Sequence, residues 1–459
     1  MSFLASSRSG VSAPRIPAPE RGAMAKIPGS NGWPIVGNTL EILADPKGVT
    51  ERSARQYGRV YRAYTLGAHT VTLLGPEANE FVFLDEAKVF SSALGWGIIL
   101  ERLFPGGLML LDFDEHRLHR KALSVAFKAG PMKAYLASLN AGVAGNVVKL
   151  RATRGLRFYP TIKAMTLDLA ATSFLGAEIG PDLDRIKQAY IEMVAATVSV
   201  VRRPIPGTQM YRGVKARAAM VAYFQKEIGR RRASAGTDLF TELCKATMED
   251  GALLSAQEVA DHMNFLMMAA HDTLASSLTS FVYFLAVNTQ WQERLRDEIL
   301  GLGLARGEPL PYERLRDLPL VEMAFNECLR LIPPAPSVLR CALRDVEFGG
   351  HCIPAGACVA VSPLYTHHMP EHWPQPETFD PLRFTPEASR DRHKYAFTPF
   401  GGGAHMCLGL HFAYMQAKCF AYHLLSTTRL VVPPDYRPGW KFWPIPQPRD
   451  GLRVSLEPL

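Results

Sequence analysis

One cysteine of this chain follows three consecutive glycines, in the segment FGGGAHMCLGL. Glycine loses more conformational entropy on folding than any other residue, so such a run indicates that the backbone must come very close to another group. Helix-like sequence follows Cys407, and a helix N-terminus favours a thiolate through its dipole and its unpaired N–H groups. A thiolate held in this way is a good ligand for iron. The alternative is a structural cysteine buried in a glycine-rich turn.

Two other pairs of residues could take part in chemistry or support it. In the segment AAHDTL, Asp272 and Thr273 combine a carboxylate with a hydroxyl, and such a pair can relay protons. The alternative is a local hydrogen-bonding pair within a helix. In the segment NECLRL, Glu327 and Arg330 are three residues apart, so they share one face of a helix.

The spacing around the cysteine resembles the haem-binding loop of the cytochrome P450 family, F-x-x-G-x-[R/H]-x-C-x-G. The five matching positions are Phe400, Gly403, His405, Cys407 and Gly409. This resemblance implies that Cys407 is the iron ligand of haem b and that the other four residues help to bind the haem. It also implies an oxidoreductase, a haem-thiolate monooxygenase that inserts one oxygen atom from O2 into its substrate.

Three more segments resemble family motifs. AAHDTL resembles the oxygen-activation motif, with Ala270 where glycine is commoner, which implies that Asp272 and Thr273 lie on the face of the iron opposite the cysteine. NECLRL resembles the E-x-x-R helix, and FDPLRF resembles the segment that supplies a second arginine, Arg383. The resemblance implies that this arginine joins Glu327 and Arg330 in a structural cluster that holds the cysteine loop.

Haem carries two propionates, which need cationic or N–H partners. The segment HRLHR fits the H-x-x-x-R pattern of the family's helix at the haem edge, with His116 and Arg120 on one face. Arg340 lies in the strand that resembles the family's other propionate contact, and His405 occupies the Arg/His position of the loop. We expect His119, between the two helical contacts, at the surface.

The segment at residues 91–111 is unusually apolar and corresponds to the family's pocket roof. An apolar lining predicts an apolar small-molecule substrate, namely a terpenoid, a steroid, a fatty acid or an aromatic hydrocarbon. The opening segment and His271 are similar to relatives that act on retinoids and sterols. The predicted pocket residues are Trp96, Ile98, Ile99, Leu110, Leu266, Ala269, Ala270 and Val338.

No flavin-binding or iron–sulfur segment follows the haem region in this sequence. The resemblance therefore implies that electrons from NAD(P)H arrive through separate redox partners, a ferredoxin and a ferredoxin reductase. The predicted docking charges are Arg117, Lys121, Lys394 and Lys418. A peroxide-driven or rearranging enzyme, and a haem sensor without turnover, are the alternatives, and the Asp272–Thr273 pair disfavours both.

Composition limits the other possibilities. Lys and Arg exceed Asp and Glu by 51 − 43 = 8, without a long basic run or zinc-finger spacing, which favours an acidic protein partner and not nucleic acid. The seven cysteines include no C-x-x-C pair, which argues against a disulfide framework or a zinc site. A reducing cytosol fits this cysteine usage best, and we expect a cytoplasmic, soluble bacterial protein.

Around these residues the chain needs long helices and a smaller set of strands. Residues 1–26 are predicted to be a disordered tail, and residues 27–459 a single domain. The resemblance implies that this domain has the cytochrome P450 fold, which is mainly α with a smaller β-rich region. Alternating residues predict a β-hairpin before Pro76, and helical spacing dominates from there to Gln292. Residues 264–287 are long and apolar enough to span a membrane, but His271 and Asp272 in the middle favour a buried helix and no transmembrane anchor.

Overall fold

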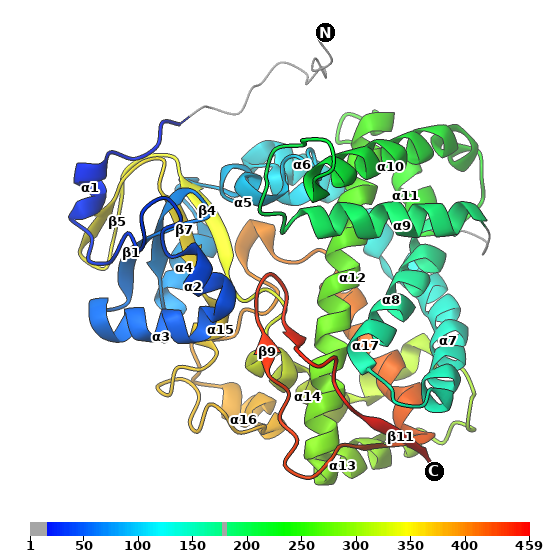
Figure 1. Cartoon of the computed structure of the whole chain (residues 1–459). Coiled ribbons are helices and arrows are strands. Elements are labelled where there is room, and N and C mark those ends of the chain that lie inside the picture. The colour runs from blue at the N-terminus through cyan, green and yellow to red at the C-terminus, as the bar shows by residue number, and fades with distance from the viewer. Residues whose placement is uncertain (1–15, 177–180) are drawn as a thin grey trace.

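The longest helix, α12 (Ala256–Val287), runs through the middle of the molecule, as Figure 1 shows. The computed structural model describes residues 16–176 and 181–459. A capping box begins α12: Ser255 Oγ accepts the N–H of Glu258 at 3.2 Å, and the Glu258 carboxylate accepts the N–H of Ser255 at 2.7 Å. Most of its residues are buried, because other helices cover it on several sides. Within the described ranges, no helix is long and apolar enough to cross a membrane.

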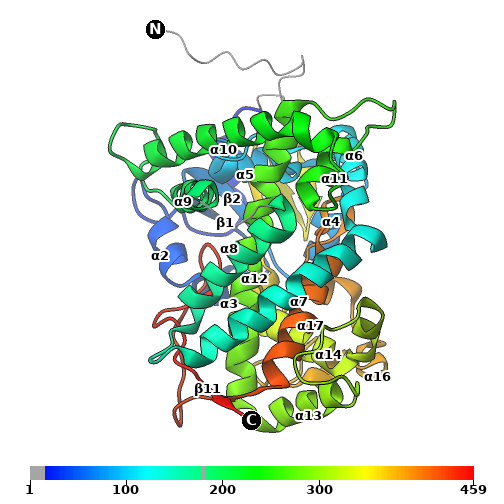
Figure 2. The same ribbon diagram turned by 90° about the vertical axis from the view of Figure 1, so that its right-hand side faces the viewer.

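Helices surround α12 on the larger side of the molecule, and in Figure 2 α7 and α8 cross in front of it. Their apolar faces join one large hydrophobic core. These helices are α6 (Phe113–Ser124), α7 (Ala129–Ala152), α8 (Phe158–Leu175), α9 (Pro181–Ala196), α10 (Gln209–Arg232), α11 (Leu239–Lys245), α13 (Thr289–Leu300), α14 (Pro319–Leu331) and α17 (Leu410–Leu425).

A five-stranded sheet forms the smaller side, with the strand order β1-β2-β7-β4-β3. The predicted hairpin before Pro76 is its β1–β2 pair, with Val60 opposite Leu73. β2 then pairs in parallel with β7, and β7 pairs antiparallel with β4. The strands are β1 (Val60–Thr65), β2 (Ala68–Leu73), β3 (Phe90–Ser91), β4 (Val338–Ala342) and β7 (Cys358–Val361).

Three two-stranded sheets and several short helices complete the described part of the chain. The paired strands are β5 (Val346–Phe348) with β6 (His351–Ile353), β8 (Thr428–Val431) with β11 (Ser455–Pro458), and β9 (Trp440–Lys441) with β10 (Gln447–Pro448). The shorter α-helices are α1 (Arg21–Ala25), α2 (Thr39–Ala44), α3 (Pro46–Tyr57), α4 (Pro76–Leu84), α5 (Ser92–Leu100), α15 (Pro363–Thr366) and α16 (Pro386–Ser389). The 3-10 turns are η1 (Leu108–Leu110), η2 (Val125–Phe127), η3 (Tyr312–Asp317), η4 (Pro381–Phe384), η5 (Lys394–Ala396) and η6 (Gly403–His405).

The mainly helical fold class with a smaller β-rich region is confirmed. The N-terminal tail needs one correction, because α1 lies within the segment predicted to be disordered and its Met24 side chain is buried in the core of the sheet region. Burial of this apolar side chain favours order there. Residues 1–15 lie outside the described part of the chain.

Candidate cofactor and active site

The glycines before the cysteine allow backbone conformations and a close approach that other residues rarely permit. Gly401 and Gly403 have φ angles of +71° and +60°, which side chains other than hydrogen rarely allow. A Cβ atom on Gly403 would lie 1.8 Å from the carbonyl oxygen of Phe83, at the end of α4. A Cβ atom on Gly402 would lie 3.0 Å from the ring of Tyr395. The loop therefore packs directly onto α4 and η5, and at Gly403 only glycine permits this approach.

This packing positions Cys407 just before α17. Its N–H donates to the Phe400 carbonyl at 2.9 Å, and the Gly409 N–H donates to its sulfur. The side chain is exposed, yet desolvation is the largest effect on its pKa. A side chain that is both exposed and surrounded by protein faces an internal cavity.

The sequence analysis expected the helix N-terminus to favour the thiolate of Cys407, which means a lowered pKa. For the protein without a bound metal ion this expectation is wrong. Burial raises this pKa, and it outweighs the Gly409 N–H and the charge of Arg120, which both lower it. The N–H donor that the sequence suggested is therefore present, and Arg120 adds a positive charge that the sequence analysis did not foresee, but together they do not outweigh the desolvation. A bound metal ion would add the missing positive charge.

Four basic groups from three separate segments gather beside the cavity. The His116 ring from α6 stacks on the His405 ring from the cysteine loop, with centroids 3.8 Å apart. Burial lowers the pKa of His405 to about 2 and that of His116 to about 4, and the charges of Arg120 and Arg340 lower both further. Among the described residues, no ion pair joins Arg120 to a carboxylate. At neutral pH both imidazoles are therefore uncharged, so Arg120 and Arg340 supply the positive charge and the histidine rings can supply N–H donors. Such a set of groups suits an anionic ligand.

These residues fit haem b. Cys407 offers sulfur to the cavity, and the cluster of His116, Arg120, Arg340 and His405 offers donors for two carboxylates. Gly409 leaves room above the loop, because the nearest atom to a Cβ there would be a Phe127 ring carbon at 3.9 Å.

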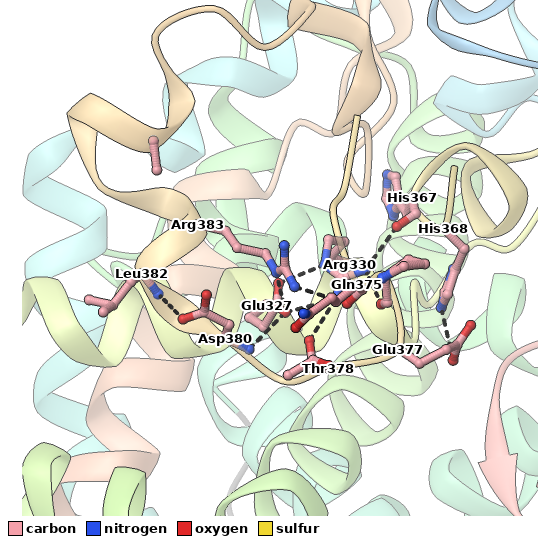
Figure 3. A network of polar contacts seen from close by, with 12 residues as sticks. Glu327, Arg330, His367, His368, Gln375, Glu377, Thr378, Asp380, Leu382 and Arg383 are labelled. Carbon is pink, nitrogen blue, oxygen red and sulfur yellow. Dashed lines mark hydrogen bonds and ion pairs between the residues drawn. The ribbon is translucent and has the colours of Figure 1, made fainter. Parts of the chain in front are cut away.

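A buried ionic network lies around Glu327 and Arg330 of α14 (Figure 3). Arg330 donates to both carboxylate oxygens of Glu327, each at 2.7 Å, and neither side chain has exposed surface. Arg383 lies 3.3 Å from the same carboxylate. Arg330 also donates to the carbonyls of His367, Pro376 and Thr378.

The network continues toward the cysteine loop through His367. Its carbonyl accepts from Arg330, and its ring Nε2 accepts the N–H of Thr398 at 2.9 Å. Thr398 in turn accepts the N–H of Gly401, the first of the three glycines, at 3.0 Å. A continuous chain of hydrogen bonds therefore connects α14 to the cysteine loop. The sequence analysis did not identify His367.

Asp272 and Thr273 occupy adjacent positions on α12 but make different contacts. The Thr273 hydroxyl donates to the Ala269 carbonyl at 2.7 Å. The Asp272 carboxylate lies 2.7 Å from Nζ of Lys163, on α8. The acid is thus held at the α8 side of the helix by an ion pair that the sequence analysis missed. Lys163 is the only Lys or Arg in α8. A single cation in this largely apolar helix was the sequence feature that could have indicated a buried acidic partner.

His271 and His119 are both more buried than their polar character suggests. The Thr166 hydroxyl lies 3.0 Å from Nδ1 of His271. His119 was expected at the surface, but it is buried, and its Nδ1 lies 2.8 Å from Nε2 of His262 on α12. The expectation for His119 is therefore wrong, because α6 packs on α12 along this side. His262 is a further residue that sequence reasoning missed.

The predicted pocket residues come from α5, η1, α12 and β4. Six of them are half-exposed apolar side chains, as expected for the lining of a cavity, whereas Leu266 is buried and Ile98 is exposed. Arg202, in the loop between α9 and α10, donates to the carbonyls of Ile98 and Ile99 at the end of α5. The half-exposed residues are Trp96, Ile99, Leu110, Ala269, Ala270 and Val338.

The predicted docking charges divide into two groups. Arg117, Lys121 and Lys394 are exposed. Lys418 is buried and lies 2.6 Å from the carboxylate of Glu322, because α17 packs on α14. Its prediction as a docking residue is therefore wrong.

Comparisons with known proteins agree with this geometry. The family model of cytochrome P450 matches residues 27–444. Cytochrome P450 136 of Mycobacterium tuberculosis is 36% identical over 447 residues, which cover 96% of this chain and 90% of the relative. Taxane 10-beta-hydroxylase of Taxus cuspidata is 26% identical over 454 residues, 95% of this chain and 91% of the relative. The structure of retinoic acid-bound cyanobacterial CYP120A1 superimposes with a TM-score of 0.84 at 30% identity, and covers 97% of this chain and 100% of that one.

Proposed function

The chain belongs to the cytochrome P450 family of haem monooxygenases, and on that basis we propose that it hydroxylates an apolar terpenoid with electrons from a ferredoxin. Members of the family act on hydrophobic substrates with haem iron and O2, and they take electrons from redox partners. The observation that carries the assignment in this chain is the exposed sulfur of Cys407 inside the protein, beside four basic groups.

Each group of the site has a defined part in the proposed reaction. Haem held by Cys407 would supply the chemistry of O2 activation, with the thiolate as its electron-donating ligand. His116, Arg120, Arg340 and His405 would bind the propionates and so orient the ring. The apolar residues of the roof exclude water from the bound substrate.

Asp272 and Thr273 move protons into the cavity. Lys163 is 37% exposed, whereas the Asp272 carboxylate beside it is only 9% exposed, so this ion pair joins solvent to the interior. The Thr273 hydroxyl, one residue further along α12, is half-exposed and can pass a proton on. We assign proton delivery to this pair, with Asp272 turning away from Lys163 during turnover.

A terpenoid is the best supported of the four predicted substrate classes. Two of the similar proteins have isoprenoid compounds in their names, a taxane in one and retinoic acid in the other. The half-exposed lining residues of this chain are all apolar, as such a substrate requires. Steroids, fatty acids and aromatic hydrocarbons remain the comparison compounds for a binding screen.

A small acidic ferredoxin, reduced by its NAD(P)H-dependent reductase, suits the net charge of +8. Arg117 and Lys121 both pair with Glu249, at 2.8 Å and 3.1 Å, whereas Lys394 has no such carboxylate among the described ion pairs. Lys394 and Arg117 are both exposed cations that an acidic partner could contact. Charge reversal of these two residues should slow haem reduction at low salt. An unchanged rate would remove these two residues from the docking surface.

The carbon monoxide difference spectrum of the reduced protein tests the haem-thiolate assignment. A strongly red-shifted Soret band is expected, and Cys407→Ser should abolish it. Thr273→Ala should keep this band but uncouple O2 consumption from product formation. Full coupling in Thr273→Ala would contradict the proton-delivery role and leave the haem-thiolate assignment standing.

A further inference from the structure

Two cysteines far apart in the sequence lie directly opposite each other in the five-stranded sheet. Cys341 of β4 pairs with Cys358 of β7 in the antiparallel register. Both thiols are free in this structure. We propose that these two residues form a redox-active pair, which hydrogen peroxide converts to a disulfide in the folded protein.

The strand pairing has the geometry that a disulfide needs. The N–H of Ala342 donates to the Ala357 carbonyl at 3.0 Å and the Ala342 carbonyl accepts the N–H of Gly356 at 2.8 Å, so the backbone groups of Ala342 face the β7 side. Bonded and non-bonded pairs alternate in antiparallel strands, which makes Cys341 and Cys358 a non-bonded pair. Cα atoms in such pairs are about 4.5 Å apart, within the range of roughly 4.4–6.8 Å that disulfides span. The charge of the Cys341 thiolate also contributes to the raised pKa of Cys358, as expected for close side chains.

The two thiols differ in access to solvent, which sets the order of the steps. Cys341 is half-buried and Cys358 is buried. Peroxide therefore reaches Cys341 first: its thiolate attacks one peroxide oxygen, the O–O bond breaks, and a sulfenic acid and hydroxide form. The Cys358 thiolate then attacks that sulfur, which forms the S–S bond, breaks the S–O bond and releases a second hydroxide. Each hydroxide takes up the proton that one thiol lost and becomes water. Two thiols and one peroxide thus give one disulfide and two waters.

Burial makes this reaction slow at neutral pH. It raises the pKa of the Cys341 thiol to about 11 and that of the Cys358 thiol to about 12. The thiolate is the nucleophile, so the rate should rise about tenfold for each pH unit below these values. A Thr70 side chain on the neighbouring strand hydrogen-bonds the Cys358 thiol and partly offsets the burial.

The pair lies beneath the roof of the proposed pocket. Leu339, Cys358 and Ala360 form a small cluster against which Trp96 and Ile99 of α5 pack. At Gly95 the helix comes so close to β4 that a Cβ would lie 2.5 Å from Cα of Arg340. A covalent bond between β4 and β7 would therefore form where α5 rests on the sheet.

Peptide mapping of the haem-loaded full chain tests the proposal. The protein is treated with hydrogen peroxide at pH 7 and pH 9, alkylated without denaturation, and digested. The expected product links the peptides of Cys341 and Cys358 with the loss of two hydrogen atoms, forms faster at pH 9, and is reversed by dithiothreitol. Both cysteines found as free thiols after treatment, or Cys341 over-oxidised beside a free Cys358, would overturn the proposal.

Two variants make the test specific. Cys341→Ser should leave Cys358 unlinked, whereas Cys352→Ser should not change the product, because Cys352 is exposed but stands opposite Glu347 and not a thiol. The disulfide closes the loop between β4 and β7, so oxidised wild-type protein should unfold at a higher denaturant concentration than reduced protein. The difference should vanish in Cys341→Ser, and an equal difference in that variant would also overturn the proposal.

Discussion

Replacing Glu327 by glutamine should strongly destabilise the protein, because the change leaves the Arg330 charge buried without its partner. The two residues share two hydrogen bonds of 2.7 Å, and both side chains are fully buried. A hydrogen bond to a charged group contributes about 1.5–3 kcal/mol, so two such bonds represent about 3–6 kcal/mol. Direct estimates for breaking a buried ion pair give about 3–5 kcal/mol, in agreement.

Guanidinium unfolding, followed by tryptophan fluorescence and by the haem Soret band, measures this loss. Trp373 is a suitable probe, since it is buried and Arg330 lies 5.2 Å from its ring centroid. The matched control is Glu371→Gln, which breaks the ion pair with Arg59. That pair has the same 2.7 Å separation, but its side chains are 49% and 55% exposed.

The control should cost only about 0–1 kcal/mol, because solvent screens exposed pairs. A loss below about 1 kcal/mol in Glu327→Gln, equal to that of the control, would refute the reasoning. Such a result would mean that the cost of desolvating the two charges cancels their attraction. It would also contradict the inference that this network stabilises the cysteine loop.

Three further perturbations have expected outcomes. Gly403→Ala should abolish haem retention, measured by the ratio of Soret to protein absorbance, because its Cβ would collide with the Phe83 carbonyl; normal retention would contradict the steric argument. Arg202→Ala should weaken apolar ligand binding about tenfold in spin-shift titrations, since its bonds join the α9–α10 loop to α5, whereas the exposed neighbour Arg203→Ala should have no effect. Burial lowers the pKa of His262 to about 3, so below about pH 6.5 the unfolded state binds a proton that the native state does not. Stability should therefore fall by about 1.4 kcal/mol per pH unit for this group as pH drops toward 3, and an unchanged pH dependence in His262→Gln would count against this.

Local spacing was enough to predict several parts of this site. Glu327 and Arg330 are three residues apart on one helix, so their contact follows from helical geometry alone. The glycine run before Cys407 indicated a close backbone approach, and the structure identifies the neighbour as Phe83. The central helix was recognisable from its length and from the polar residues within it.

Contacts between distant segments were not predictable in this way. The partner of Asp272 is Lys163 on α8, and the partner of His119 is His262 on α12. Neither pair has a fixed separation in sequence, because each depends on how two helices pack. Lys418 was misassigned for the same reason, since its burial follows from the packing of α17 on α14.

The sequence by itself determined the local chemistry of this protein: a cysteine in a glycine-rich loop, an acid–hydroxyl pair and an E-x-x-R helix. Only the tertiary structure decided the environment of those groups. It exposed Cys407 to a cavity while burial raised its pKa, and it brought Cys341 opposite Cys358 through strand register. The physical reason is that residue type and short-range geometry are fixed by the order of the chain, whereas desolvation, electrostatic neighbours and strand register depend on which segments pack together.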